Sequence, residues 1–433
     1  MDRIRASFHF YYAGIVVLLA LVLGGGTEQG LWTDHVVEIV LLPALFLGLA
    51  RIADTRLPMA ARLLAIVILC LVLLQFVPVL RTLPALPGTG GTYFAFYSLA
   101  PQKSLESSLF ALSVLGFFLF LSRFSDADQE RLTAFLLIGL FVNLVAATIE
   151  FSYGTSSNGG EVFPYPFQAG LFTNENHFSS LVYVMIPLLA YLTLKRRRQV
   201  GTFIGVLAVM LLVLFAAGSR AGMAIATTLA LVSALWFYPE EQSRARKLCV
   251  LGVGVATIVL IAWRFGFDSA IENDLRAVFY QTTWRAIEEH WLTGTGLGTF
   301  TLVYPGVERA SQIVSVFANH AHNEYLELWL ETGIIGILLI GVFAGLALLH
   351  FSRSGLAEAA FIAIIALMLH SLVDYPLRTL GLAIPFAFFV AVILSTKSHP
   401  DDEAMAAMNP RSQRVRRRSS RRQRRTREPA ALG

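Results

Sequence analysis

The amino-acid sequence predicts an all-α polytopic membrane protein with about twelve transmembrane helices, and three observations carry that prediction. The 433 residues are 56% apolar and only 15% charged, and their mean hydropathy is +0.64. This composition excludes an ordinary soluble domain. Apolar runs long enough to cross a bilayer recur along the chain. Lys and Arg residues gather in alternate connections between these runs, as they do in membrane proteins.

The apolar runs define the predicted spans in chain order. They lie near residues 8–24, 36–50, 60–80, 105–122, 132–149, 178–194, 201–217, 221–238, 247–264, 333–350, 356–373 and 380–396. The second run and the last few are short for a hydrocarbon core about 30 Å thick. Their ends are therefore predicted only to within about four residues.

The basic residues predict how the spans are oriented. If both termini are cytoplasmic, 26 of the 34 Lys and Arg residues fall on the cytoplasmic side, where the positive-inside rule expects them. The eight exceptions are Arg81, Lys103, Arg220, Arg264, Arg276, Arg285, Arg309 and Arg378. We therefore expect cytoplasmic termini, and the outward-facing basic residues become candidates for function.

Three connections on the outer side, 81–104, 150–177 and 265–332, are longer than a simple link requires. Long ordered connections usually carry function. The residues from Asp274 to Trp291 have a helical pattern. The connection 265–332 is therefore predicted to form a helical subdomain.

The chain is predicted to divide into a transmembrane domain, 1–398, and a tail, 399–433. The tail holds ten arginines between Arg411 and Arg427 and few apolar residues, a composition typical of disorder. We expect it to bind anionic lipids from the cytoplasm. Nucleic-acid binding is not expected, because the tail has no aromatic residue on which bases could stack.

The densest polar segment beside a predicted span is Asn319-His320-Ala321-His322-Asn323-Glu324-Tyr325-Leu326-Glu327, just before 333–350. Such side chains are expensive to place beside a bilayer, which predicts a functional site. His322 fits a general base, because imidazole exchanges protons near neutral pH, and His320 is its rival. A different interpretation takes both histidines and Glu324 as zinc ligands, although the spacing fixes no further outer ligand.

Arg220 and Arg276 are candidates for binding a phosphorylated substrate, because the guanidinium fork matches phosphate oxygens and stays charged. On the predicted helix, Arg276 and Tyr280 share one face and Arg285 points to the other side. The following Gly294-Thr295-Gly296-Leu297-Gly298 could cradle phosphate, but no strand precedes it, which favours a tight turn.

Polar residues also end the predicted span 356–373. Asp374 and Arg378 lie on either side of Pro376, which breaks a helix. We expect the carboxylate and the guanidinium to pair with each other and to support the site.

Taken in order, these residues resemble the core signature of the O-antigen ligase/O-antigen polymerase superfamily. The carrying motifs are Arg276-x-x-x-Tyr280, Gly294-x-Gly296-x-Gly298-x-Phe300 and His322-Asn323-x-Tyr325-Leu326-x-x-x-x-Glu331-x-Gly333-x-x-Gly336. Two upstream stretches are similar to its other recurrent motifs: Gly170-x-Phe172-x-Asn174-x-Asn176 and Gly218-Ser219-Arg220-Ala221-Gly222. The resemblance covers about 168–340.

The resemblance implies a metal-independent, inverting glycosyltransferase of GT-C type, without a cofactor, on the periplasmic face of the bacterial inner membrane. Its donor would be a glycan on undecaprenyl pyrophosphate, and its acceptor a lipid A-core sugar or a growing polysaccharide. Family arginines hold the pyrophosphate, here Arg220 and Arg276, and a family histidine acts as base, here His322 or His320. The residues expected to support them are Asn174, Asn176, Tyr280, Asn323, Glu331, Arg285, Asp374 and Arg378.

Ligase and polymerase activities both fit this pattern. A transporter or flippase for lipid-linked glycans is an alternative of another class. It would require repeat symmetry and charged or broken helices near the membrane midplane, whereas the candidate residues gather at one outer edge of the predicted spans.

Overall fold

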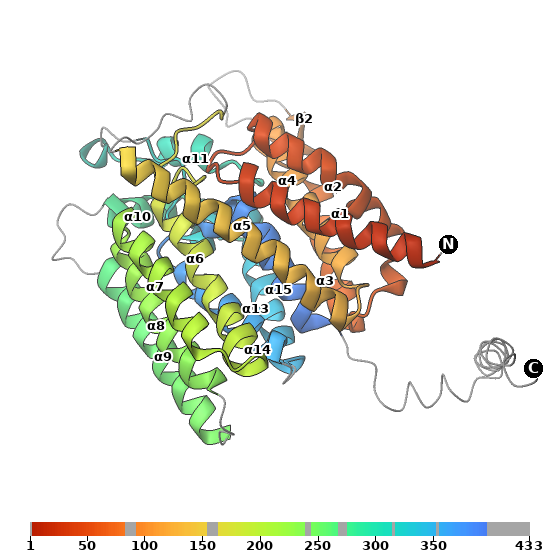
Figure 1. Ribbon diagram of the computed structural model, residues 1–433. Coiled ribbons are helices and arrows are strands. Elements are labelled where there is room, and N and C mark those ends of the chain that lie inside the picture. The colour runs from red at the N-terminus through yellow and green to blue at the C-terminus, as the bar shows by residue number, and fades with distance from the viewer. Residues whose placement is uncertain are drawn as a thin grey trace, which may run out of the picture. The chain divides into compact units, whose positions relative to one another are not determined.

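The structure is a computed structural model that describes residues 2–82, 92–153, 163–238, 244–266, 275–313, 317–351 and 355–395. The predicted tail, 399–433, lies outside the described residues. Within these ranges the chain forms fifteen α-helices and one two-stranded hairpin (Figure 1). The predicted all-α membrane protein is confirmed at this level.

The helices are named in chain order. The first nine are α1 (Asp2–Leu23), α2 (Trp32–Ala50), α3 (Met59–Leu74), α4 (Pro101–Leu121), α5 (Asp126–Tyr153), α6 (Glu175–Ala190), α7 (Val200–Ala217), α8 (Arg220–Phe237) and α9 (Arg244–Gly266). The others are α10 (Leu275–His290), α11 (Phe300–Val307), α12 (Glu324–Thr332), α13 (Ile334–Leu349), α14 (Gly355–His370) and α15 (Leu380–Leu394). Short turns of other helical types are η1 (Ile52–Asp54), η2 (Tyr191–Arg196), η3 (Ala310–Gln312) and η4 (Pro376–Arg378).

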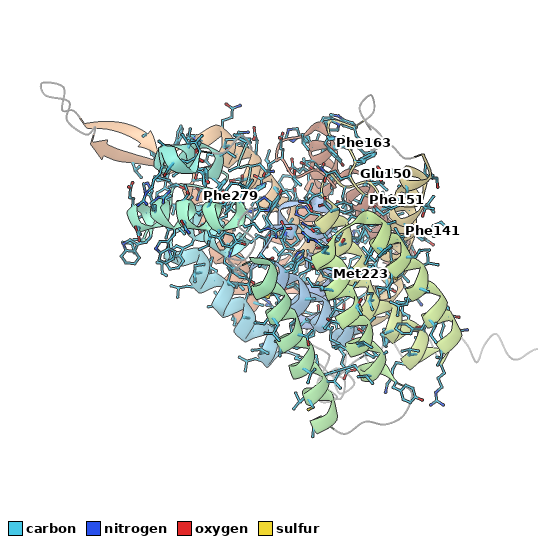
Figure 2. The ribbon with its side chains drawn as sticks, turned by 90° about the vertical axis from the view of Figure 1, so that its left-hand side faces the viewer. Phe141, Glu150, Phe151, Phe163, Met223 and Phe279 are labelled. Carbon is cyan, nitrogen blue, oxygen red and sulfur yellow. The ribbon has the colours of Figure 1, made fainter. Side chains whose placement is uncertain are left out.

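Each of the twelve predicted apolar runs corresponds to a helix, namely α1 to α9 and α13 to α15. Six helices in the described ranges are long and apolar enough to cross a membrane: α2, α4, α5, α6 with η2, α7 and α8. The other six apolar helices are shorter, so the count of twelve spans and the GT-C-like arrangement stay predictions. Large apolar side chains such as Phe141 of α5 point away from the bundle (Figure 2), as lipid-facing side chains do.

Strand structure that the apolar pattern did not indicate begins inside the predicted span 60–80, since α3 ends at Leu74, and continues into the connection predicted as 81–104. Strands β1 (Pro78–Thr82) and β2 (Thr92–Phe96) pair antiparallel, with Pro78 opposite Phe96 and Thr82 opposite Thr92. The β-branched and aromatic residues of Thr92–Phe96 favour an extended backbone. This hairpin is a small exception to the all-α expectation.

Helix α6 is the centre of the bundle, since every residue from His177 to Ala190 is buried. It packs closely on α8 because small residues meet there. A Cβ atom added to Gly222 would lie only 2.3 Å from Cβ of Ser179, so glycine allows this approach. The contact places the first turns of α6 and α8 side by side.

The bundle has two chemically different ends. At one end, Arg56 pairs with Asp126 at 2.6 Å, Arg196 pairs with Glu130, and Gln129 reaches Ser395 at 3.2 Å. At the other end, the turn after α1 meets the turn before α15, where Gly381 N donates to Gly24 O at 2.7 Å. Helices α10, α11 and α12 lie at this second end (Figure 1). Which end faces the cytoplasm stays a prediction from the basic residues.

Candidate active site

Polar segments from distant parts of the sequence converge on the carboxylate of Asp374, which is fully buried in the turn between α14 and α15. Its Oδ1 atom lies 3.6 Å from Nδ1 of His322 and 3.8 Å from Nε2 of His177. Its Oδ2 atom lies 3.9 Å from Nη2 of Arg276. The fold therefore brings residues of α6, α10 and the segment before α12 around one carboxylate.

Asp374 is an anion in the folded protein. Burial alone would raise the pKa of this carboxyl, but the His177 and His322 imidazoles that face it hold that pKa well below the usual range. A buried anion attracts the N–H of an imidazole and so selects its tautomer. Asp374 therefore favours the tautomer of His322 that carries its proton on Nδ1.

His322 is held in an unusual conformation that leaves its other ring nitrogen available. Its φ of +51° lies in the left-handed region, which non-glycine residues occupy at a cost and often at functional sites. Tyr280 Oη donates to the His322 carbonyl at 2.9 Å. The His322 imidazole stacks on Phe279, which is labelled in Figure 2. The side chain is 23% exposed, and Nε2 has no protein partner within the described residues. Nε2 is thus free to accept a proton.

His320 has a different environment from His322. Its Nδ1 lies 2.7 Å from Oε1 of Glu327, and its Nε2 lies 3.0 Å from the carbonyl oxygen of Thr27. Both neighbours are acceptors, so both ring nitrogens donate and the imidazole is cationic. Burial alone would lower the pKa of His320, but Glu327 raises it. Because its two nitrogens are both engaged, the geometry favours His322 over His320 as a base.

Three glutamates on one face of α12 bind the surrounding turns. Glu324, Glu327 and Glu331 are spaced so that a helix places them together. Besides His320 and Arg378, their donors are the backbone N–H groups of Leu377 (2.6 Å), Ala321 (2.8 Å) and Gly298 (2.9 Å), together with the hydroxyl of Ser371. The α12 glutamates therefore tie the α14–α15 turn, the histidine segment and the glycine-rich turn to one helix.

Arg378 pairs with α12 and not with Asp374, which corrects the pairing expected from the sequence. Its guanidinium lies 3.0 Å from Glu331 and 3.5 Å from Glu327. The turn η4, which begins at Pro376, carries Arg378 to the side of the connection that faces α12. Arg378 and Glu331 therefore support the framework of the site.

Charges in this framework are balanced. Burial raises the pKa of Glu324 to about 7 and also raises that of Glu331. Burial would likewise raise the pKa of Glu327, but His320 and Arg378 outweigh it and hold that pKa low. Burial lowers the pKa of Arg378, but the nearby glutamates raise it more. The two cations are thus matched by carboxylates and leave no spare positive charge for a phosphate.

Arg220 stands at the adjoining first turns of α6 and α8. Asn174 caps α6 by accepting from Asn176 N at 2.8 Å, and Ser219 caps α8 by accepting from Gly222 N at 3.1 Å. Ser219 Oγ also donates to Asn176 Oδ1 at 2.7 Å, which fixes the two helix ends together. Arg220 is exposed and has no carboxylate partner among the described residues. Two helix N-termini with an exposed arginine favour an anion.

The family comparison covers the centre of this constellation. Residues 205–341 match the family model described as O-antigen ligase. The resemblance to the O-antigen ligase superfamily is confirmed. No curated protein matches this chain. The match supports glycan transfer of ligase or polymerase type in general, with lipid-linked glycans and polysaccharides as the substrate class.

The O-antigen ligase match includes Arg220, Arg276 and both histidines, but two parts of the site lie outside it. These are the first turn of α6 and the turn that carries Asp374. His177 of that first turn was not among the residues singled out from the sequence. Its position directly after the Asn174-x-Asn176 motif is the signal that could have found it.

The remaining predicted site residues have structural contacts. Asn323 caps α12 by accepting from Tyr325 N and Leu326 N at 3.0 and 3.1 Å, and it donates to Leu372 O at 2.8 Å. Arg285 donates to Thr282 Oγ1 at 2.9 Å within α10. Neither contact joins these side chains to the Asp374 carboxylate.

The glycine-rich stretch is a tight turn in the structure. Gly294, Gly296 and Gly298 all have positive φ. The Gly296 N–H donates to the Glu331 carbonyl, and the Gly298 N–H donates to the Glu331 side chain, both at 2.9 Å. Because these N–H groups are used by the protein, the turn interpretation holds and the phosphate cradle has no support.

The zinc-ligand interpretation also finds no geometric support. His320 points to Glu327, His322 points to Asp374, and Glu324 binds Ser371. Among the described residues, no group of three His, Cys, Asp or Glu side chains is arranged to hold a metal ion. The three proposed ligands therefore face three different partners.

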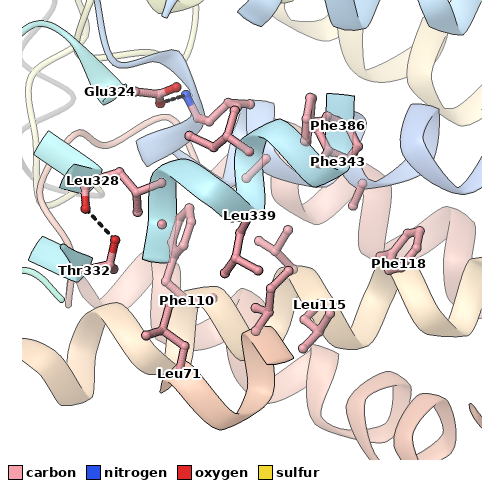
Figure 3. Close-up of a pocket in the computed structure, with 18 of the residues that line it drawn as sticks. Leu71, Phe110, Leu115, Phe118, Glu324, Leu328, Thr332, Leu339, Phe343 and Phe386 are labelled. Atoms are coloured by element: carbon pink, nitrogen blue, oxygen red, sulfur yellow. Dashed lines mark hydrogen bonds between the residues drawn. The ribbon is translucent and has the colours of Figure 1, made fainter. Parts of the chain in front are cut away.

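An apolar cavity of about 430 Å³ is lined in part by Ser371, Leu377 and Arg378 of the connection between α14 and α15. Its walls come from α3, α4, α13 and α15, with Leu71, Phe110, Leu339 and Phe386 among the residues drawn in Figure 3. Its polar end is lined by Glu324, Glu331 and Arg378 of the framework described above. The space suits a hydrocarbon chain whose polar group is not strongly anionic.

Proposed function

We propose that this protein transfers a glycan from undecaprenyl pyrophosphate to an acceptor sugar hydroxyl on the periplasmic face of the bacterial inner membrane. The observation that carries the proposal is the Asp374–His322 pair with Nε2 free, beside Arg276 and linked by the first turn of α6 to the anion-favouring helix ends at Arg220. A base and phosphate-binding cations are the two parts that this reaction needs.

The proposed step is a single displacement. His322 Nε2 removes the proton from the acceptor hydroxyl as its oxygen attacks the anomeric carbon of the donor sugar. The bond from that carbon to the phosphate oxygen breaks, and its electron pair leaves on undecaprenyl pyrophosphate. Attack opposite the leaving group inverts the anomeric centre. Asp374 stabilises the imidazolium that forms on His322.

The proposed role of the two arginines is to stabilise negative charge on the leaving group. Arg220 is exposed beside two helix N-termini, and Arg276 is only 22% exposed beside Asp374. Guanidinium groups bind phosphate oxygens without a change of protonation. This chemistry needs no metal ion, so we propose a metal-independent transferase.

We further propose that the apolar cavity receives a hydrocarbon chain of a lipid acceptor such as lipid A-core. Arg378 at its polar end is already neutralised by two glutamates, so a pyrophosphate is disfavoured there. Filling the cavity by Ala111→Trp should raise KM for a lipid acceptor and leave KM for the donor unchanged. Val209→Trp, on the exposed side of α7, is the matched control.

Two assays test the function itself. Purified protein with lipid-linked oligosaccharide should release undecaprenyl pyrophosphate and form either a capped lipid acceptor, as a ligase does, or a ladder of longer glycans, as a polymerase does. Arg220→Ala and Arg276→Ala should each lower the rate roughly tenfold to hundredfold, and Arg285→Ala should be milder. Movement of intact lipid-linked glycan across vesicles without transfer would favour the flippase instead.

The proposed orientation has its own test. Cysteine substitutions at Ser311 and Ser419 are labelled with an impermeant thiol reagent in intact spheroplasts, with Cys70 and Cys249 replaced. Ser311→Cys should react and Ser419→Cys should not. The reverse pattern would place the site in the cytoplasm and exclude the periplasmic reaction.

A further inference from the structure

His177 is a buried histidine that the proposed reaction does not yet use. Its side chain is 0% exposed in the first turn of α6, and both of its ring nitrogens lack a hydrogen-bond partner among the described residues. His322 Nδ1 and Asp374 Oδ2 in the same cluster are also without one. A buried polar atom left without a partner destabilises the folded state. Four such atoms around one carboxylate therefore need an explanation beyond packing.

We propose that His177 is a positioning residue for the transfer reaction, acting on His322 through the Asp374 carboxylate that both histidines face. His177 Nε2 and His322 Nδ1 lie 3.8 and 3.6 Å from the same atom, Oδ1. Oδ1 also accepts from Tyr375 N at 2.9 Å. The contact from His177, in addition to that from Tyr375 N, limits rotation of the carboxylate and keeps Oδ1 directed at His322. The inference rests on the proposed function, since it assigns His322 as the base.

The surroundings of His177 leave Asp374 as its natural partner. Tyr375 meets the His177 ring edge-on, with ring centroids 4.8 Å apart, so this contact is between the two aromatic rings. His370 of α14 is also near, but its Nδ1 is engaged with Ser180 at 3.1 Å and Tyr183 at 2.8 Å. Arg276 reaches the opposite oxygen of the carboxylate. A small shift of His177 toward Oδ1 would complete a hydrogen bond without disturbing another one.

The position of His177 also links the two halves of the site. The preceding residue, Asn176, accepts from Ser219 beside Arg220, and His177 faces Asp374. One helical turn therefore contacts both the proposed pyrophosphate-binding end and the proposed base. Binding of the donor at Arg220 and the orientation of His322 can then be coupled through the rigid first turn of α6.

The test compares His177→Phe, His177→Gln and Tyr183→Phe. Tyr183 lies in α6 and is as deeply buried as His177, and Tyr183→Phe removes one hydrogen bond to His370. This variant is therefore the matched control. His177→Phe should lower kcat about tenfold to hundredfold with donor KM within about twofold. His177→Gln keeps an N–H that can donate to the carboxylate and should restore kcat to within about tenfold of the natural protein. Tyr183→Phe should keep the natural kcat.

Stability separates positioning from a structural role. Because both ring nitrogens of His177 lack partners, His177→Phe should leave Tm unchanged or raise it, while activity falls. A lower Tm with a proportional loss of activity would show that His177 only supports the fold. Equal losses in His177→Phe and His177→Gln, or no loss in either, would overturn the proposal.

A chemical readout keeps this test independent of the transfer assay. Diethyl pyrocarbonate modifies neutral imidazole, and mass spectrometry can follow its reaction at His322. Without His177, the Asp374 carboxylate is less restrained and presents Nε2 of His322 less well to the reagent, so modification should slow about threefold or more in His177→Phe. An unchanged rate would refute the coupling. If the natural protein transfers no glycan but the slowing is seen, the proposed function fails and the coupling stands.

Discussion

Replacement of Asp374 by asparagine tests the central pair of the site. The change keeps the size of the side chain and an oxygen that can accept from Tyr375 N, but it removes the negative charge that faces His322. If His322 is the base, an imidazolium forms on it only while the acceptor proton is being transferred. Asp374→Asn should therefore slow the chemical step and leave donor binding nearly unchanged.

The magnitude follows from the distance between the two groups. For unit charges 3.6 Å apart, an effective dielectric constant of about 20 gives roughly 4–5 kcal/mol, which is an upper bound. Each 1.4 kcal/mol corresponds to about a tenfold change in rate. A loss of roughly 10²–10³-fold in kcat is expected, within the range that a general base contributes.

A double-mutant cycle with His322→Ala identifies the route of this effect. If Asp374 acts through His322, the double variant should be no slower than His322→Ala alone. Asp126→Asn, which breaks an ion pair at the opposite end of the bundle, is the control and should keep full activity. Multiplicative losses in the double variant would refute the Asp374–His322 pairing, since Asp374 would then act on the substrate or on folding.

Further predictions concern the histidines, the metal and the framework. His322→Ala should lose roughly 10²–10⁴-fold in kcat with donor binding and Tm retained. His320→Ala should lose less activity per folded molecule but lower Tm, because it removes one of the two cations that neutralise the buried Glu327. Activity should persist in EDTA, and chelator-sensitive transfer restored by zinc or magnesium would contradict the metal-free mechanism. Glu324 holds its proton to about pH 7 in the folded protein, against 4.5 for an ordinary glutamate, so stability should fall as pH rises through that window. Glu324→Gln should flatten this dependence and have the higher Tm at pH 8; a Tm that falls in parallel with the natural protein would assign the effect to another group.

The helices of this fold were predictable because apolar side chains signal them directly. All twelve apolar runs became helices, with ends within a few residues of the expected positions for most of them. The hairpin was not predictable in the same way, because its five-residue strands are too short to give a periodic signal. Strand β2 lies in a long connection, which was the only indication of ordered structure there, and β1 begins inside the predicted span 60–80.

The candidate site was predictable in its residue types more than in its contacts. The motifs singled out His322 and Arg276, and their positions near one carboxylate are consistent with shared chemistry. The partner of Arg378 was predicted wrongly, because a pair with Asp374 was expected across Pro376 and the η4 turn prevents it. Sequence spacing gives side-chain direction only inside regular elements, and this connection is not one.

The two neighbouring histidines illustrate how position along the chain and chemical role can differ. His320 and His322 are separated by one residue, yet the left-handed backbone at His322 turns its ring toward Asp374, while His320 faces Glu327. His320 is thereby placed in a charge-balanced framework with Arg378, and His322 keeps one nitrogen for a substrate. His322→Gly would relieve the backbone strain at this position, and imidazole added to the solution would replace the missing side chain. The variant would keep the backbone turn but lose the oriented ring. Recovery of only a small part of the rate by free imidazole is therefore expected, because orientation by Asp374 supplies the rest.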